Sequence, residues 1–129
     1  MSLLIDTHVL LWWFLDSSKL RKKTRDLLAD LGTPVYVSAA STWEISIKSA
    51  LGRLILPGTP SYYLPDRILR AGLSRLPITM EHTYGVESLP LHHADPFDRL
   101  LIAQAQCEGF AIVTSDRVFS KYDVHCIQA

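Results

Sequence analysis

Residues 95–116 have the sequence DPFDRLLIAQAQCEGFAIVTSD, which joins a strong helix signal to a strong strand signal. Asp95 is a typical N-cap, proline is favoured at the first helical position, and Gly109 is typical of the position just past a helix end. We therefore expect a helix over 96–108, followed at once by a buried strand over 111–114.

Strands and helices alternate outward from this stretch to both ends of the chain. The further strands are expected at 3–5, 35–37, 76–78 and 124–127, and the further helices at 7–15, from Ser17 or Ser18 to Leu31, from Ser38 or Ser41 to Leu51, at 62–71 and at 79–88. Such alternation predicts a parallel sheet covered by helices on both faces. Right-handed crossovers then bring the carboxyl ends of the strands to one edge, where ligands bind in open α/β sheets.

Length and composition narrow the class of protein. The 129 residues suit one domain, 1–129, and 48% apolar residues indicate a folded chain. Thirteen basic and thirteen acidic residues cancel, so net charge indicates no nucleic-acid partner. Cys107 and Cys126 lack disulfide-framework spacing and fit reduced thiols of a cytoplasmic protein. No apolar stretch approaches a membrane span, and the N-terminus lacks the basic residue of a signal peptide.

Four carboxylates lie at the ends of apolar elements. Asp6 and Asp116 directly follow two predicted strands, whereas Glu44 and Asp98 lie near the starts of two predicted helices. Because these strand ends and helix starts face the same edge of a parallel sheet, we expect the four side chains to converge. Clustered acids repel one another and must protonate or bind a cation. All-oxygen ligation favours Mg²⁺ or Mn²⁺, and hence phosphate chemistry.

Each of these acids also has an ordinary structural interpretation. Asp6 would cap the first helix, and Glu44 would complete a capping box with Ser41 or pair with Lys48 one turn later. The other two acids suit a helix start and a turn. Capping requires each acid locally but does not require all four on one edge, which favours a shared site. Asp95 is assigned to capping alone.

Four segments of the chain together resemble the PIN-domain family, in particular the VapC-type toxins of bacterial toxin–antitoxin pairs. The segments are LLIDT at 3–7, SAASTWEI at 38–45, DPFDRLLIAQA at 95–105 and IVTSD at 112–116. The resemblance extends from residue 3 to residue 126 in the family's usual element order. It implies a PIN-like three-layer α/β/α fold with a central parallel sheet.

The resemblance also implies an activity. It indicates an Mg²⁺- or Mn²⁺-dependent endoribonuclease that hydrolyses RNA phosphodiesters with a metal-activated water. It carries the catalytic and metal-binding roles onto Asp6, Glu44, Asp98 and Asp116. It further implies an RNA substrate, for which tRNA and rRNA are candidates, a homodimer, and a cognate antitoxin that blocks the site; the RNA target itself is not encoded in a readable motif. Two alternatives stay open: a catalytically silent PIN-like binding module, and a phosphoryl-accepting α/β domain.

Supporting roles are expected for five neighbours of the acids. Ser41, Thr114 and Ser115 could orient a ligand or a water molecule through hydrogen bonds. Arg99 and Arg117 directly follow two of the acids and could hold RNA phosphate or pair with the acids.

Three other features are less specific. His92 and His93 are adjacent, and adjacent histidines rarely point to one ion, so no histidine metal site is expected. The basic run from Lys19 to Arg25 favours a solvated helix face, with a phosphate-contacting rim as the alternative. Trp12 and Trp13, followed by a third aromatic residue, cannot all be buried on one side of a helix. They predict a dimer or antitoxin surface, with stacking on RNA as the alternative.

Overall fold

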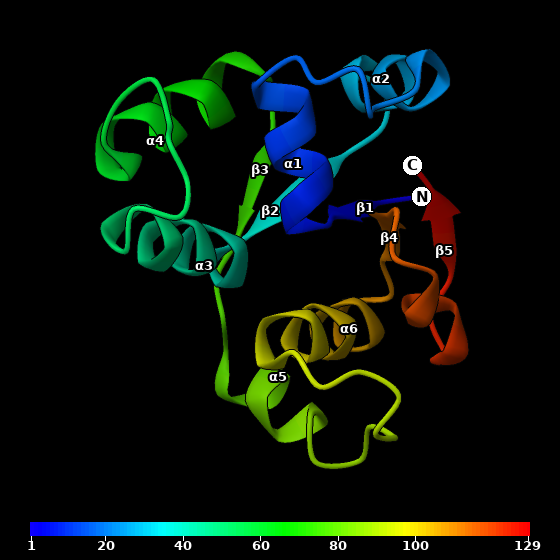
Figure 1. The fold of residues 1–129 in the computed structure, drawn as a ribbon. Coiled ribbons are helices and arrows are strands. Elements are labelled where there is room, and N and C mark those ends of the chain that lie inside the picture. The colour runs from blue at the N-terminus through cyan, green and yellow to red at the C-terminus, as the bar shows by residue number, and fades with distance from the viewer.

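The strands form one parallel sheet, and the structure, a computed structural model, describes all 129 residues. The strands are β1 (Leu3–Ile5), β2 (Val35–Ser38), β3 (Ser74–Leu76), β4 (Ala111–Thr114) and β5 (Cys126–Gln128). They lie in the order β3-β2-β1-β4-β5 (Figure 1). In the central strand β1, Leu3 is in register with Val35 of β2 and with Ala111 of β4. The carboxyl ends of β1 and β4 therefore lie side by side.

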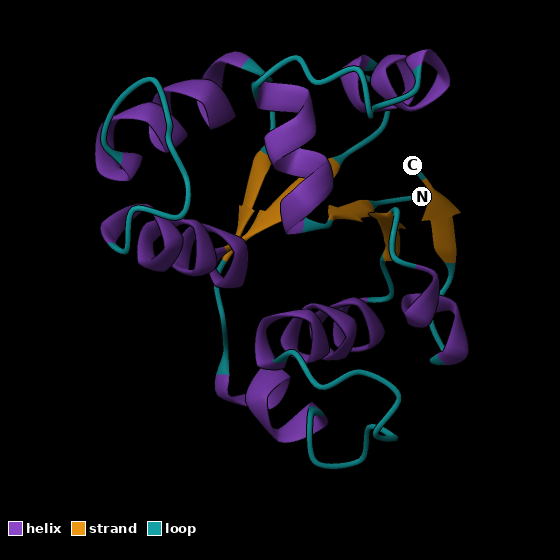
Figure 2. Ribbon diagram, in the orientation of Figure 1, coloured by secondary structure: helices purple, strands orange, loops and turns teal.

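Helices cover both faces of this sheet (Figure 2). They are α1 (Thr7–Phe14), α2 (Lys22–Ala29), α3 (Ala39–Ala50), α4 (Pro60–Arg70), α5 (Met80–Gly85), α6 (Pro96–Glu108) and the 3₁₀ helix η1 (Arg117–Lys121). Successive side chains of β1 point to opposite faces of the sheet and therefore contribute to two separate hydrophobic cores. Leu3 and Ile5 pack with apolar residues of α1 to α4, whereas Leu4 packs with Leu101 of α6 and Phe119 of η1. The predicted three-layer α/β/α fold is confirmed.

The predicted start of α2 is wrong. The helix begins at Lys22 instead of Ser17 or Ser18. The Ser17 hydroxyl accepts a hydrogen bond from the Lys19 backbone N–H at 3.2 Å, which stabilises a local turn in competition with the helix. Leu20 is buried from within this turn.

Two further differences concern short elements. β3 ends at Leu76 and does not extend over 76–78, because Pro77 has no N–H to donate to the ladder. η1 was not expected, since a single 3₁₀ turn has no apolar period to reveal it. Its N-cap is Asp116, so the turn directly involves one of the four acids.

The aromatic and basic residues near the N-terminus lie partly at the surface. Trp12 and Trp13 are half-buried against the core, and the Lys19 ammonium lies 5.9 Å from the centre of the Trp12 ring. Lys22 pairs with Asp26 one turn later at 2.8 Å, in keeping with a solvated helix face. A protein interface at the two tryptophans stays a prediction. None of the helices has the length and apolar character needed to cross a membrane.

Candidate functional site

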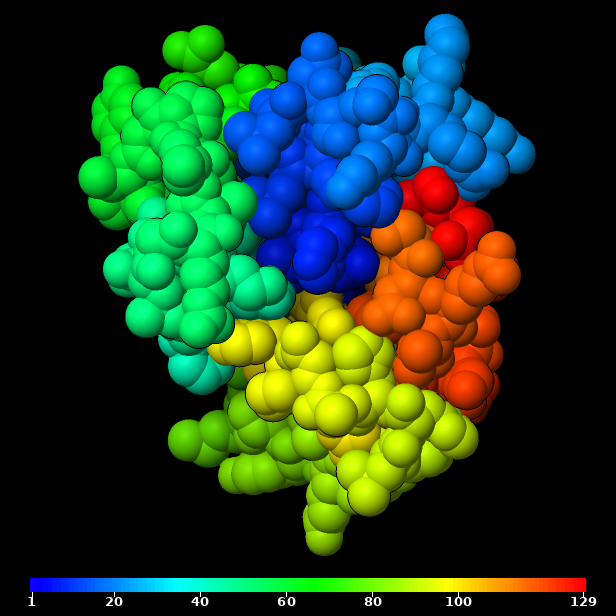
Figure 3. All heavy atoms as spheres, in the orientation of Figure 1, coloured from blue at the N-terminus to red at the C-terminus, as the bar shows by residue number.

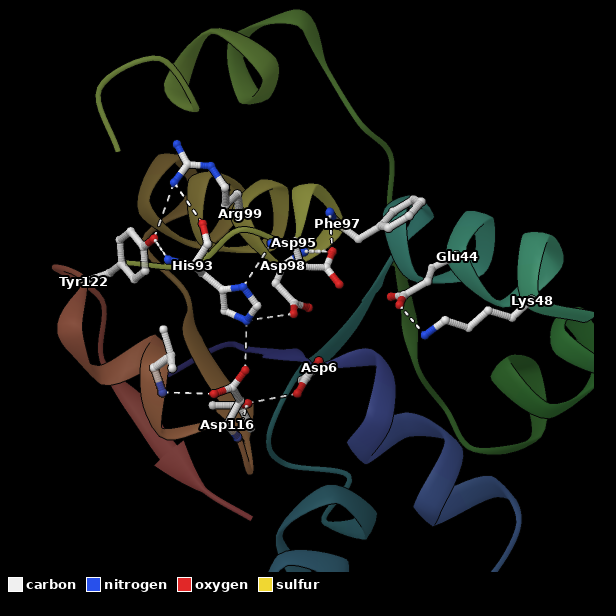
Figure 4. Close-up of polar contacts among 12 residues, drawn as sticks. Asp6, Glu44, Lys48, His93, Asp95, Phe97, Asp98, Arg99, Asp116 and Tyr122 are labelled. Atoms are coloured by element: carbon white, nitrogen blue, oxygen red, sulfur yellow. Dashed lines mark hydrogen bonds and ion pairs between the residues drawn. The ribbon is translucent and has the colours of Figure 1, made fainter. Parts of the chain in front are cut away.

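The four acids come from four elements and face one shared space. Asp6 follows β1, Asp116 follows β4, Glu44 lies in α3, and Asp98 lies in the first turn of α6. Figure 4 shows their carboxylates pointing toward one another. In Figure 3 the segments that carry them, coloured blue, teal, yellow and orange, meet near the centre of one face. The sheet topology thus brings together residues far apart in the sequence.

Asp6 occupies the N-cap position of α1, yet its side chain makes no capping hydrogen bond. Oδ2 instead accepts a hydrogen bond from the Thr114 hydroxyl at 2.9 Å, and Oδ1 is buried with no partner. Burial raises the pKa of Asp6, and the Thr114 hydrogen bond opposes the rise. The predicted N-cap position of Asp6 is confirmed, but its Oδ2 is directed to Thr114 and the site.

Glu44 pairs with a lysine on its own helix. Oε2 accepts a hydrogen bond from Lys48 Nζ at 2.7 Å, while Oε1 is buried without a partner. The proposed capping box with Ser41 is wrong, because Ser38 caps the helix three residues earlier. The Ser41 hydroxyl lies 2.8 Å from that of Thr7, so it links α3 to α1 beside the acids.

Asp95 and Asp98 divide two tasks at the start of α6. Asp95 Oδ1 accepts the N–H groups of Phe97 and Asp98, which confirms its capping role. The Asp98 carboxylate is nearly buried in the shared space. Burial, followed by the charges of Asp6 and Asp95, raises the pKa of Asp98 to about 7, and His93 opposes the rise. Such a pKa indicates a site with too little positive charge for its acids.

Asp116 uses both of its carboxylate oxygens. Oδ1 accepts the Val118 N–H at 2.9 Å and caps η1, as its turn interpretation predicted. Oδ2 lies 2.9 Å from His93 Nε2. The Asp116 N–H donates to the Thr114 hydroxyl oxygen at 3.0 Å, and that hydroxyl donates to Asp6. A relay of hydrogen bonds thus joins the acids at the ends of β1 and β4.

His93 lies with the acids, and its group with Asp98 and Asp116 could hold a metal ion, although no histidine metal site was expected. Its Nε2 lies 2.9 Å from Asp116 Oδ2 and 3.0 Å from Asp98 Oδ2. His92 points elsewhere, with its ring edge-on to Tyr122 at 5.1 Å. Adjacent histidines do diverge, as expected, but one of them still reaches the acids.

The side chains present fit a hard divalent cation. Two buried carboxylate oxygens, Asp6 Oδ1 and Glu44 Oε1, have no hydrogen-bond donor. Leaving such an atom unpaired costs roughly 1–3 kcal/mol, and more when it is charged. Carboxylate oxygens that converge from several acids are the ligands that Mg²⁺ and Mn²⁺ prefer. A bound cation would satisfy both oxygens and relieve the repulsion among the acids.

The expected supporting residues differ in where they lie. Thr114 and Ser41 contact the site as described, Ser115 is half-buried beside Asp116, and Arg117 is exposed. Arg99 does not lie with the acids, and Figure 4 shows its guanidinium turned away from them. It donates instead to the Tyr122 hydroxyl and to the backbone carbonyls of Val86, Leu89, Pro90 and His93. Its role is therefore to hold the loop before α6.

An aromatic pair, which the sequence analysis missed, joins α3 to the first turn of α6. Trp43 and Phe97 immediately precede Glu44 and Asp98 in the sequence. Their ring centres lie 5.0 Å apart in an edge-to-face arrangement. Trp43 is 56% exposed, which is unusual for so large an apolar side chain. The pair thus links the two helices that carry Glu44 and Asp98 and leaves the Trp43 ring open to solvent.

A separate apolar cavity of about 450 Å³ lies between α3, α4 and β3. Thr42, Leu64, Ile68 and Leu76 contribute to its wall, and no acid does. Because no acid lines this cavity, it offers a cation no carboxylate ligand.

A model of the PIN domain matches residues 3–125. The chain belongs to the PIN-domain family. Over 61 residues it is 41% identical to Ribonuclease VapC16 of Mycobacterium tuberculosis, a match covering 47% of this chain and 43% of that protein. The chain thus aligns with less than half the length of this relative.

Solved structures agree with the fold. A chain of VapBC2 from Rickettsia felis, bound to a DNA fragment from its promoter, superposes with a TM-score of 0.75 at 14% identity, covering 99% of this chain and 98% of that one. A chain of DNA-bound VapBC from Salmonella typhimurium gives a TM-score of 0.71 at 14% identity, with 99% and 98% covered. At such identities the likeness supports the fold alone.

Proposed function

We propose that this chain is a metal-dependent endoribonuclease of the VapC type and the toxin of a toxin–antitoxin pair. The observation that carries the proposal is the convergence of Asp6, Glu44, Asp98 and Asp116, with two buried carboxylate oxygens left without donors. Membership of the PIN-domain family and the match to Ribonuclease VapC16 support the same activity.

Three of the four acids have one oxygen held by a donor on the protein and a second oxygen available. Thr114 holds Asp6 Oδ2, Lys48 holds Glu44 Oε2, and His93 contacts Asp98 Oδ2. Such anchoring orients the remaining oxygens before a cation arrives. We propose that these remaining oxygens, together with Asp116, hold Mg²⁺ or Mn²⁺. When bound, the ion supplies Lewis acidity, which makes water a better nucleophile and neutralises charge on the phosphate.

The rim of the site suits a single-stranded substrate. Unpaired RNA bases stack on exposed aromatic rings, and Trp43, the residue before Glu44, offers such a ring. Arg117 is exposed just after Asp116 and could contact a backbone phosphate. We propose unpaired segments of tRNA or rRNA as the substrate class. A cytoplasmic homodimer with a cognate antitoxin over the site completes the proposal.

The proposal is tested by incubating purified, antitoxin-free protein with a pool of tRNA and rRNA. The reactions contain Mn²⁺, Mg²⁺ or excess EDTA, and the cut ends are sequenced. We expect metal-dependent cuts that leave a 5′-phosphate and a 3′-hydroxyl, because attack by water does not use the 2′-hydroxyl. Asp98→Asn should abolish them, whereas Asp123→Asn, at an exposed acid of the loop before β5, should not.

Two outcomes would contradict the mechanism. Substantial cleavage in EDTA, or by a folded Asp98→Asn variant, would show that the acids do not act through a cation. A protein that binds the cation but cuts no RNA would favour the silent binding module.

A further inference from the structure

We propose that His93 is a positioning residue of the cation site. Its neutral ring donates the Nε2 proton to Asp98 and Asp116 and holds both carboxylates for the ion, without itself being a ligand. The inference depends on the proposed function only in that the acids bind a divalent cation.

The first argument is the shared contact. His93 Nε2 lies 2.9 Å from Asp116 Oδ2 and 3.0 Å from Asp98 Oδ2, so one N–H faces two carboxylates (Figure 4). The two acids come from different elements, the end of β4 and the start of α6. Carboxylates this close repel unless a donor or a cation lies between them. His93 therefore fixes the spacing between two elements of the site.

The second argument is the position of the ring proton. His93 Nδ1 accepts the backbone N–H of Asp95 at 3.1 Å. A ring nitrogen that accepts carries no proton, so the neutral ring must hold its proton on Nε2. A doubly protonated ring would set its Nδ1–H against the Asp95 N–H. The hydrogen bonds thus define a single state, in which Nε2 is a donor.

The hydrogen bond from the Asp95 N–H to Nδ1 also argues against metal ligation by His93. A histidine that ligates a metal through one nitrogen almost always donates a hydrogen bond with the other. Here Nδ1 accepts, which leaves Nε2 without a free lone pair for an ion. The imidazole therefore shapes the acidic site from one side and leaves oxygen atoms as the only ligands.

The third argument is how firmly the loop is held. The His93 N–H donates to the Tyr122 hydroxyl at 2.7 Å, and the His93 carbonyl accepts from Arg99 Nη1 at 3.4 Å. The ring packs edge-on against Phe119 at 5.8 Å. Contacts on the backbone and on both ring nitrogens leave the imidazole little freedom to rotate. This rigidity is what a positioning residue requires.

The test measures Mn²⁺ affinity of the full-length protein without RNA, by the loss of the free-ion electron paramagnetic resonance signal. His93→Ala removes the donor and should weaken Mn²⁺ binding by about 10- to 100-fold, the usual effect of losing such a partner. His93→Gln places an amide N–H near the position of Nε2 and should restore most of the affinity. His92→Ala is the matched control and should bind Mn²⁺ like the original protein.

A second measurement does not depend on any variant. Nitrogen-15 NMR of the metal-free protein should show the His93 ring protonated on Nε2 and bare on Nδ1. Pulsed electron paramagnetic resonance of the Mn²⁺ form should show no strong coupling to an imidazole nitrogen. Unchanged affinity in a folded His93→Ala variant, a proton on Nδ1, or a directly bound nitrogen would each overturn the proposal.

These outcomes separate the two proposals of function and positioning. If the original protein binds Mn²⁺ with the expected His93 dependence but cleaves no RNA, the ribonuclease proposal fails and the positioning proposal stands. If it cleaves RNA with metal but His93→Ala binds Mn²⁺ normally, the reverse holds.

Discussion

His82 and His93 make the same pair of contacts in two different regions of the molecule. In each ring Nδ1 accepts a backbone N–H, from Thr79 at 3.0 Å and from Asp95 at 3.1 Å. In each ring Nε2 faces a carboxylate, and His82 lies 3.0 Å from Glu108. The local chemistry of the two histidines is therefore alike.

The carboxylates around the two rings differ. His82 is 1% exposed and serves one acid, Glu108, whose side chain is 36% exposed and can also bind water. With Thr79 it forms the capping box that starts α5. His93 serves two acids inside a larger cluster of four, where Lys48 is the one cationic partner in contact. The His82 pair therefore balances its single acid, whereas around His93 the acids outnumber the donors, which is the imbalance on which the proposed cation site rests.

The same contrast bears on a group of possible metal ligands around His82. His82, Cys107 and Glu108 have ligand atoms within 4.8 Å of one another, which resembles a transition-metal site. However, His82 Nδ1 accepts the Thr79 N–H, so Nε2 carries the proton and donates to Glu108. The contact between His82 and Glu108 is therefore explained by a hydrogen bond and requires no ion.

The largest expected effect is a loss of RNA cleavage when one acid beside His93 is changed, with no such loss for the acid beside His82. Asp98→Asn should reduce RNA cleavage by about 10²–10³-fold or more, the scale seen when a group that stabilises transition-state charge is removed. Glu108→Gln, the matching change beside His82, should leave cleavage unchanged. Cleavage rates at saturating Mn²⁺ measure both, and equal losses would show that the two regions are not functionally distinct.

The next largest effect is on the free energy of unfolding, and we expect it when His82 is substituted. His82→Ala removes a buried ring and one half of the capping box, and should lower the free energy of unfolding by about 2–3 kcal/mol. Urea denaturation measures this loss. Mn²⁺ affinity of the folded protein should not change, whereas His93→Ala should change it. A large change in Mn²⁺ affinity for His82→Ala would be inconsistent with its structural assignment.

Metal-free stability should depend on pH through Asp98. Its pKa is raised from 3.8 to about 7 in the folded protein, so the folded state binds this proton more tightly than the unfolded state. The free energy of unfolding should therefore fall as pH rises through that window. We expect a loss of about 2 kcal/mol, less than the full conversion of about 1.36 kcal/mol per pKa unit, because the rim is open to water.

Thermal unfolding in EDTA at several pH values measures this dependence. Asp98→Asn should flatten it, Mn²⁺ should reverse it at high pH, and Glu108→Gln should leave it in place. Metal-free stability that rises steadily through the same window would contradict the crowding of the acids.

The smallest expected effect concerns the aromatic rim. Trp43→Ala should raise KM for unpaired RNA by about 5- to 10-fold, since stacking contributes roughly 1–3 kcal/mol per base. Trp43→Phe should raise KM by less, and Trp12→Ala, far along α1, should leave KM unchanged. Steady-state kinetics on a short single-stranded RNA measure all three. A drop in kcat with unchanged KM would assign Trp43 to the chemistry and not to substrate binding.

The sequence could predict features set by local signals. The start of α6 is signalled by Asp95 and Pro96, and its end by Gly109. The structure confirms both ends. The edge on which the acids gather follows from strand polarity, since Asp6 and Asp116 each end a parallel strand. Such features require no knowledge of distant contacts.

Other features depend on packing between distant segments. His93 reaches Asp116 only because Tyr122 and Arg99 hold its loop, and no residue spacing encodes that arrangement. Ser41 looked like a helix cap, but Ser38 at the end of β2 already fills that role. In both cases the sequence supplies candidates, and tertiary contacts decide among them.

The most direct test of the account is anomalous diffraction from crystals of the metal-free protein soaked in Mn²⁺. The account predicts a peak among the four acids, within bonding distance of Asp6 Oδ1 and Glu44 Oε1, with His93 Nε2 beyond bonding distance. The absence of a peak at that place, or a peak bound to His93 Nε2, would contradict it.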